Sequence, residues 1–279
     1  IRIVTQPAEK GEPFPENGPP GTRIVHNEGV YHTWYKLPRN SEQGVLHYAE
    51  SSDGFNWQKV MVCEVDWSAC PEAKGSESPE IFLDPSGRED ERFKMFVRSS
   101  IGDTDNDRMN VIETFKKSRP DDIYPTVGTS MEHLSGMYGA VSPDGIHWKG
   151  IPGPLVIHYS DTTNVVHYDA QLERYVWYAR CNWFYGRRSI GRAETDDFRQ
   201  WPGPDMLVWP STELHPTDDW YTNSKTTYPG TDNYHLMFPA LYHHFDDTSE
   251  LRMFSSPDGM VWSEVPGGPV LSHGMPGDW

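Results

Sequence analysis

"SSPDGMVW", residues 255–262, is one of four similar segments in the chain. The others are "SSDGFNW", "VSPDGIHW" and "ETDDFRQW", which end at Trp57, Trp148 and Trp201. Three of the four contain Asp-Gly, a dipeptide that supports the positive φ angle of a tight turn. A catalytic residue is rarely needed four times. We therefore interpret the segment as a turn whose Trp begins the next strand.

Three short segments with strand composition precede each turn. In the third copy they are "NVVHYDAQ" (164–171), "ERYVWYAR" (173–180) and "SIGRAET" (189–195), separated by polar residues. Together with the strand that follows the turn, each copy reads as a four-stranded antiparallel meander. No long amphipathic helical pattern is found, so the predicted fold class is all-β.

The spacing of the closing Trp residues supports a repeated unit and marks an insertion. Trp148 and Trp201 are 53 residues apart, whereas Trp57 and Trp148 are 91 apart, and the excess falls in the polar stretch 101–136. Repeats of about 40–50 residues with four strands each are typical of β-propeller blades. We predict one β-propeller domain over residues 1–279. Its blades are expected at about 22–62, 78–152, 163–209 and 222–271.

Composition limits the partners. The formal net charge of -17 argues against nucleic acid or an anionic membrane as a partner, because binding a phosphate backbone requires Lys and Arg. The sequence has no run of eighteen apolar residues, so no membrane-spanning helix is expected. The first ten residues lack a signal-peptide pattern, so any signal peptide has been removed or never existed. Localisation is left open, with a secreted or periplasmic location favoured over a cytoplasmic one, and the oligomeric state is not predicted.

The three cysteines are too few for a disulfide scaffold and lack zinc-site spacing. Cys63 and Cys70 are close enough in sequence for a local disulfide, with two reduced thiols as the alternative. Cys181 follows an apolar run and is expected to pack in the core.

Several segments resemble a known superfamily. "SPEIFLDPSGREDERFKMFVRSS", "TNVVHYDAQLERYVWYAR", "GRAETDDFRQW" and "LRMFSSPDGMVW" resemble the five-bladed β-propeller glycoside hydrolases, which include arabinanases, β-xylosidases and invertases. The resemblance covers residues 22–278. It implies a five-bladed propeller that acts on an oligosaccharide or polysaccharide, as in bacterial carbohydrate use. Only four units are found before the short "GGPVLSHGMPGDW", so either the propeller has four blades or its fifth blade is incomplete in this chain, and the second is favoured.

Acidic residues recur where the innermost strand of each predicted blade begins. In a propeller these positions converge on one mouth of the central channel. The acidic residues there are Glu77, Glu80, Asp161, Asp218, Asp219 and Asp278. The family commonly has an aspartate at the corresponding place in the first blade, whereas this chain has Arg23 nearby.

Glycoside hydrolysis needs one carboxylic acid to protonate the leaving oxygen and one carboxylate to activate water or to attack. We predict Glu80 as the acid, because its apolar sequence neighbours should raise its pKa. Asp161, followed by polar residues, should stay ionised and act as the base. The two assignments could be reversed, and Asp219 is the third carboxylate of the predicted catalytic set.

Further polar and aromatic residues could complete a sugar site. Arginines could bind the substrate or simply pair with the carboxylates, and Trp and Tyr could stack on a sugar or fill the core. The predicted substrate-binding residues are Arg23, Glu77, Arg98, Arg180, Trp183, Arg192, His215, Tyr221 and Asp278. His158 and His167 are further candidates for orienting groups or for proton transfer. No cofactor or metal ligand is predicted, although a structural or channel-bound calcium ion would be compatible with this fold.

Three functions remain open at this point. The favoured one is a glycoside hydrolase. A glycoside phosphorylase would need the arginines free to bind phosphate, and a non-catalytic propeller would bind sugar or protein without a facing pair of carboxylates.

Overall fold

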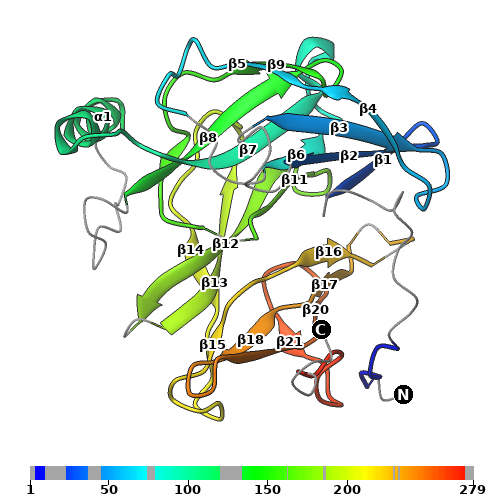
Figure 1. The fold of residues 1–279 in the computed structure, drawn as a ribbon. Helices are drawn as coiled ribbons and strands as arrows, with labels where there is room; N and C mark the ends of the chain where they lie inside the picture. The colour runs from blue at the N-terminus through cyan, green and yellow to red at the C-terminus, as the bar shows by residue number, and fades with distance from the viewer. Residues whose placement is uncertain are drawn as a thin grey trace.

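The chain folds mainly into antiparallel β-sheets, as the computed structural model shows (Figure 1). The structure describes residues 4–9, 23–36, 45–73, 79–119, 134–161, 163–184, 187–228, 230–231 and 233–273. In this part of the chain, one α-helix and one short 3-10 helix accompany the strands. The predicted all-β class is therefore confirmed. None of the helices described is long and apolar enough to cross a membrane.

Five sheets are found among the described residues, and four of them follow one another along the chain. The first contains β1 (Ile24–Asn27), β2 (Val30–Lys36), β3 (Leu46–Ser51) and β4 (Gln58–Val62). The second contains β6 (Glu80–Leu83), β7 (Phe93–Ser100), β8 (Ser135–Ser142) and β9 (His147–Gly150), with β10 (Val156–Ile157) paired to β8. The third contains β11 (Val165–Asp169), β12 (Arg174–Phe184), β13 (Arg187–Thr195) and β14 (Asp205–Val208). The fourth contains β16 (Lys225–Thr227), β17 (His235–Met237), β20 (Phe254–Ser256) and β21 (Ser263–Glu264).

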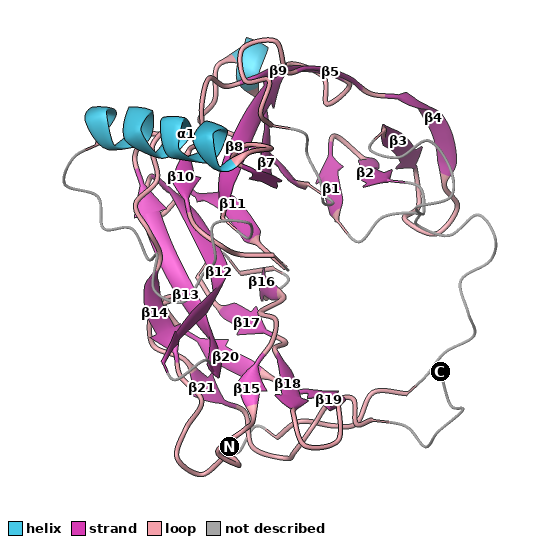
Figure 2. Cartoon of the chain, turned by 60° about the vertical axis from the view of Figure 1, so that its left-hand side comes forward, coloured by secondary structure: helices cyan, strands magenta, loops and turns pink. Residues whose placement is uncertain are grey.

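The sheets are arranged around an arc (Figure 2). β1, β11 and β16 lie on its inner side, and β4 and β14 lie on its outer side. β6 contacts both β1 and β11, so the first strands of consecutive sheets are neighbours. The predicted four-stranded antiparallel sheets are thus confirmed, whereas their number and closure as blades of one propeller stay a prediction.

Apolar side chains fill the space between consecutive sheets. Because successive strand residues point to opposite faces, Met95 packs toward the first sheet while its neighbour Phe96 packs toward the third. Trp177 and Trp201 are fully buried between the second and third sheets. Trp220 and Phe254 pack against the third sheet from the other side. This packing fixes the positions from which the first strand of each sheet starts.

The repeated Asp-Gly segment forms the same turn three times. Gly54, Gly145 and Gly259 have φ angles of 77°, 79° and 72°. The aspartate before each glycine accepts two backbone N–H groups through Oδ1, and for Asp144 the donors are Ile146 at 2.8 Å and His147 at 2.9 Å. The closing Trp donates its indole N–H to the glycine carbonyl. The predicted turn is confirmed, but only the glycine needs a positive φ, and the aspartate acts as a hydrogen-bond acceptor.

Replacing Asp144 with alanine should lower the free energy of unfolding by about 1–2 kcal/mol, because two backbone donors lose their acceptor. Asp144→Asn keeps an acceptor oxygen and should recover most of that loss. Urea denaturation followed by circular dichroism measures both variants. Equal stability of the alanine variant and the parent would contradict the prediction.

Two details of the strand and helix pattern were predicted wrongly. The insertion contains α1 (Asp105–Ser118), which buries Ile112 and Phe115, although no helical pattern was recognised. β5 (Glu64–Asp66) pairs parallel to β9, so the second sheet is not purely antiparallel. The 3-10 helix spans Glu89–Glu91.

The fourth sheet differs from the predicted continuous meander. The segment 233–242 is not one strand, because Pro239 has no N–H group to donate to the ladder. After this break the chain continues as β18 (Ala240–His243). This strand belongs to a separate three-stranded sheet with β15 (Asp219–Trp220) and β19 (Thr248–Leu251).

The three cysteines are all buried, and none of them forms a disulfide. The disulfide considered for Cys63 and Cys70 does not form, and burial raises the pKa of each of these thiols to about 12. Cys181 packs in the core of the third sheet, as predicted.

Candidate active site

Arg23 and Glu80 come together where β1 and β6 begin. Arg23 Nε donates to Glu80 Oε2 at 2.7 Å, and Arg23 Nη2 forms an ion pair with Oε1. The same Nη2 donates to the carbonyl oxygen of Asn164 at 2.8 Å, just before β11. These contacts bring the starts of three inner strands to one place, as expected for converging blades.

Glu80 has the environment that its apolar neighbours predicted. Its side chain is buried, and burial raises its pKa to about 7 although Arg23 and the N–H of Val166 act in the opposite direction. A carboxyl group with such a pKa is partly protonated at neutral pH. It can therefore donate a proton there, which an ordinary glutamate cannot.

Asp161 lies in the loop between β10 and β11. It forms an ion pair with the buried Arg180 of β12, and the hydroxyl of Tyr159 donates to its Oδ2 at 3.0 Å. The guanidinium group stabilises a negative charge on Asp161. The Asp161 side chain is 26% exposed, so a ligand can reach it.

Asp219 is held more tightly, at the start of β15. Its Oδ2 accepts hydrogen bonds from the backbone N–H of Arg188 at 3.2 Å and from the guanidinium of Arg188 at 3.0 Å. His244 Nε2 lies 2.9 Å from the same oxygen. The Asp219 side chain is 0% exposed, so it positions other groups and does not itself reach a ligand.

A continuous series of contacts joins Asp161 and Asp219. Arg98 lies over the ring of Tyr159 at 4.9 Å, and both Arg180 and Arg188 lie over the ring of Tyr221 at 4.9 Å. We name this series the Arg–Tyr–Asp chain. Its members, in order, are Arg98, Tyr159, Asp161, Arg180, Tyr221, Arg188 and Asp219. It crosses from the second sheet, through the third, to β15.

Several groups in this chain keep hydrogen-bonding capacity. Arg180 Nε and Nη1 and Asp219 Oδ1 are buried and have no hydrogen-bond partner among the described residues. A buried polar atom without a partner costs about 1–3 kcal/mol. Such an atom indicates a place where ordered water is bound or, for the guanidinium of Arg180, where a ligand could bind.

Backbone strain also gathers at the inner-strand starts. Thr163 and Ser224 have φ angles of 42° and 43°, in the left-handed region that a β-branched residue such as threonine avoids. Asn223 Nδ2 donates to the carbonyl oxygen of Thr163 at 2.6 Å, which joins the starts of β11 and β16. Strained residues of this kind cluster at functional sites.

Two predicted substrate-binding residues lie away from this chain. Arg192 is buried between the third and fourth sheets, where it pairs with Glu194 and lies over the ring of Tyr178. His215 is exposed in the loop before β15, where its Nδ1 lies 2.8 Å from the hydroxyl of Thr217. Glu77, Asp278 and the side chain of Trp183 lie outside the described residues.

Sequence reasoning missed two titratable groups, one on an inner strand and one just after β18. Lys225 of β16 is buried, its Nζ lies 3.1 Å from His167 Nε2, and burial lowers its pKa to about 8. His244, which holds Asp219, was also missed. A lysine in the short inner-strand segment "SKTTY" was the available signal for the first, and no local pattern pointed to the second.

The described residues do not fit a channel-bound calcium ion. Calcium takes about six to eight oxygen ligands. Between β11 and β16, however, the ammonium of Lys225 meets the ring of His167, and neither group supplies an oxygen. Within the described ranges, no three His, Cys, Asp or Glu side chains are placed to hold a metal ion.

The fold is similar to those of known carbohydrate-active enzymes. A thermostable family-43 glycoside hydrolase superposes with a TM-score of 0.60 at 14% identity, over 93% of this chain and 78% of the other. A Bombyx mori family-32 β-fructofuranosidase gives a TM-score of 0.54 at 11% identity, over 89% of this chain and 48% of the other. The chain has the fold of the propeller-type glycoside hydrolases. No protein-family model matches the sequence, and none of the curated proteins compared is similar to it.

This propeller-type fold does not by itself determine the reaction. An N-acetylgalactosamine deacetylase from F. plautii, in complex with blood group B trisaccharide, superposes with a TM-score of 0.52 at 12% identity. That comparison covers 98% of this chain and 77% of the other. The chemistry must therefore be argued from the side chains of the site.

Proposed function

We propose that the protein hydrolyses a glycosidic bond in an oligosaccharide or polysaccharide. The four sheets are then blades of a propeller of the five-bladed type, and the substrate binds where their inner strands begin. The single observation that carries this proposal is the Arg–Tyr–Asp chain together with the buried Glu80, whose partner Arg23 also donates to the backbone of Asn164, three residues after Asp161.

The chain of contacts suits a polyhydroxylated ligand. A guanidinium group only donates hydrogen bonds and an ionised carboxylate only accepts them, whereas a sugar hydroxyl does both. Arg180 and Asp161 lie side by side, so neighbouring hydroxyls of one sugar ring could bind both. Tyr159 and Tyr221 orient the arginines, because guanidinium groups lie over both rings.

Two carboxyl groups with different environments support acid–base chemistry. Glu80 is the general acid, since burial keeps its proton near neutral pH. Asp161 is the base or nucleophile, since Arg180 stabilises its charge and a quarter of its side chain is accessible. Asp219 is a positioning residue that holds Arg188, and through it Tyr221.

Hydrolysis is favoured over phosphorolysis because the arginines that phosphate would need are paired. Arg180 pairs with Asp161, Arg188 with Asp219, and Arg192 with Glu194. A phosphate bound at any of these arginines would lie beside a carboxylate of the same sign of charge, which opposes its binding.

The test uses the intact chain and a panel of nitrophenyl glycosides and unmodified oligosaccharides, with and without inorganic phosphate. We expect reducing sugar from at least one substrate, at a rate that phosphate does not change, with products followed by NMR. A sugar phosphate formed only with phosphate would establish phosphorolysis. Binding of oligosaccharides without any product would establish a non-catalytic propeller.

A further inference from the structure

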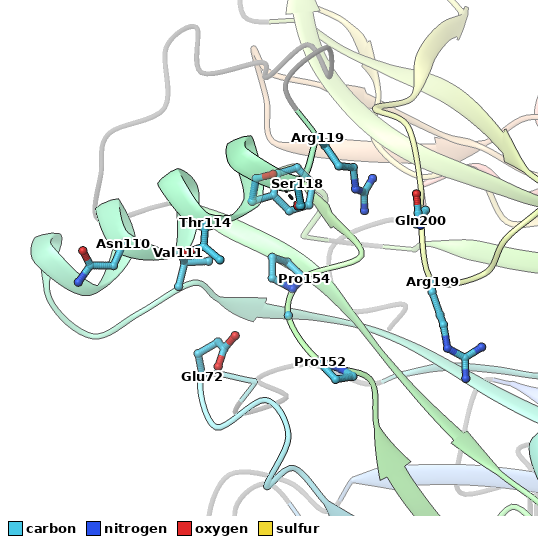
Figure 3. A pocket seen from close by; sticks show the side chains of 12 residues that line it. Glu72, Asn110, Val111, Thr114, Ser118, Arg119, Pro152, Pro154, Arg199 and Gln200 are labelled. Carbon is cyan, nitrogen blue, oxygen red and sulfur yellow. Dashed lines mark hydrogen bonds between the residues drawn. The ribbon is translucent and has the colours of Figure 1, made fainter.

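A groove outside the Arg–Tyr–Asp chain lies between α1 and the loop that follows β9 (Figure 3). Its volume is about 570 Å³, which is within the range of small-molecule sites. The residues that line it include Asn110, Thr114, Ser118, Pro152, Pro154 and Gln200. None of these residues belongs to the Arg–Tyr–Asp chain.

The helical wall of the groove is held firmly in place. A capping box between Thr104 and Asp107 starts α1, and Phe115 is buried. At the other end, Arg119 donates to the carbonyl oxygens of Trp201, at 2.6 Å, and Leu155. The groove is therefore formed before any ligand arrives.

The helix presents polar side chains to the groove. Asn110, Thr114 and Ser118 are spaced four residues apart, so they form one stripe along α1 (Figure 3). The side chains of Asn110 and Thr114 make no hydrogen bond with any described residue, and both residues are exposed. A surface helix usually turns its polar face to bulk water. Here that face lines a concave surface.

The opposite wall combines flat apolar groups with further donors. Pro152 and Pro154 present rigid rings, and Gln200 and Arg199 add an amide and a guanidinium (Figure 3). Arg199 is held by Glu91, with Nη2 and Oε1 2.7 Å apart. The amides and hydroxyls of this groove both donate and accept, as sugar hydroxyls do.

We propose that the groove is a second, non-catalytic carbohydrate-binding site, which takes a short neutral oligosaccharide. The sugar hydroxyls bind the stripe of Asn110, Thr114 and Ser118, and the apolar faces of the rings contact Pro152 and Pro154. Binding at this groove does not depend on the proposed hydrolysis, because the two sites share no residue.

Titration calorimetry with xylotetraose, cellotetraose and mannotetraose tests the proposal. All proteins carry Asp161→Asn, so that a bound probe is not consumed. Thr114→Trp fills the groove from an exposed helical position and should weaken binding of at least one probe by about tenfold or more. The matched control is Glu113→Trp, which places the same bulk on the neighbouring exposed residue outside the lining and should bind as the parent does.

Each outcome separates this proposal from the proposed function. Equal affinities in the Thr114→Trp and Glu113→Trp proteins, or no binding of any probe to the parent, would overturn the groove site. Binding that Thr114→Trp removes, in a protein that hydrolyses no glycoside before Asp161 is changed, would support the groove and reject the hydrolase.

Discussion

Replacing Asp161 with asparagine should lower kcat/KM for the best glycoside substrate about a thousandfold, or about 4 kcal/mol. Asparagine keeps the size of the side chain and can still accept the hydrogen bond of Tyr159. It can neither take a proton nor attack a sugar carbon, so the chemical step is lost while the fold is kept. Initial rates measured across substrate concentrations give the comparison.

The matched control for this variant is Asp196→Asn. Asp196 also pairs with an arginine of the third sheet, since Arg174 Nε lies 2.9 Å from its Oδ1, but it lies in the exposed turn after β13. The control should keep the parental kcat/KM. An Asp161→Asn protein that retains more than about a tenth of the parental kcat/KM would remove Asp161 from the catalytic pair.

The strands were predictable because their signals are local. Each Asp-Gly turn lies within a few residues of its Trp, and the aspartate acts on the backbone two and three residues ahead. The helix α1 was missed because its apolar stripe is short, with only Ile112 and Phe115 buried. Thr104 and Asp107, which form its capping box, were a readable sign of a helix start.

The site was less predictable because its contacts join distant parts of the chain. Arg23 and Glu80 meet across two sheets, and the sequence around either residue does not indicate the other as its partner. Arg98, Arg180 and Tyr221, which the sequence offered as substrate-binding residues, lie in one series of contacts. Arg192 occupies a similar position in sequence, but it points between the third and fourth sheets toward Tyr178.

Replacing Glu80 with glutamine should lower kcat/KM about a hundredfold or more for substrates with a sugar or alkyl leaving group. The amide cannot donate a proton to the departing oxygen. A dinitrophenyl glycoside leaves without protonation, so the same variant should hydrolyse it at nearly the parental rate. Equal losses on both substrates would show that Glu80 is not the general acid.

Glu80 is also buried and accepts a hydrogen bond from Arg23, so stability needs its own control. Glu194→Gln removes the carboxylate partner of the buried Arg192 away from the Arg–Tyr–Asp chain. We expect Glu194→Gln and Glu80→Gln both to lower the melting temperature. Glu194→Gln should leave kcat/KM unchanged. This comparison separates loss of an ion pair from loss of the acid.

The pH dependence of kcat/KM and of the unfolding free energy tests whether Glu80 is the group that carries the catalytic proton. Burial raises its pKa from 4.5 to about 7, so the parental kcat/KM for unactivated substrates should fall as the pH rises through about 7.

Because the folded state holds this proton more tightly than the unfolded state does, Glu80 contributes stability that is fully present below pH 4.5. That contribution is lost as the pH rises through about 7. In Glu80→Gln, the fall in kcat/KM and this part of the pH dependence of the unfolding free energy should both disappear. Their persistence would assign the titration to another group.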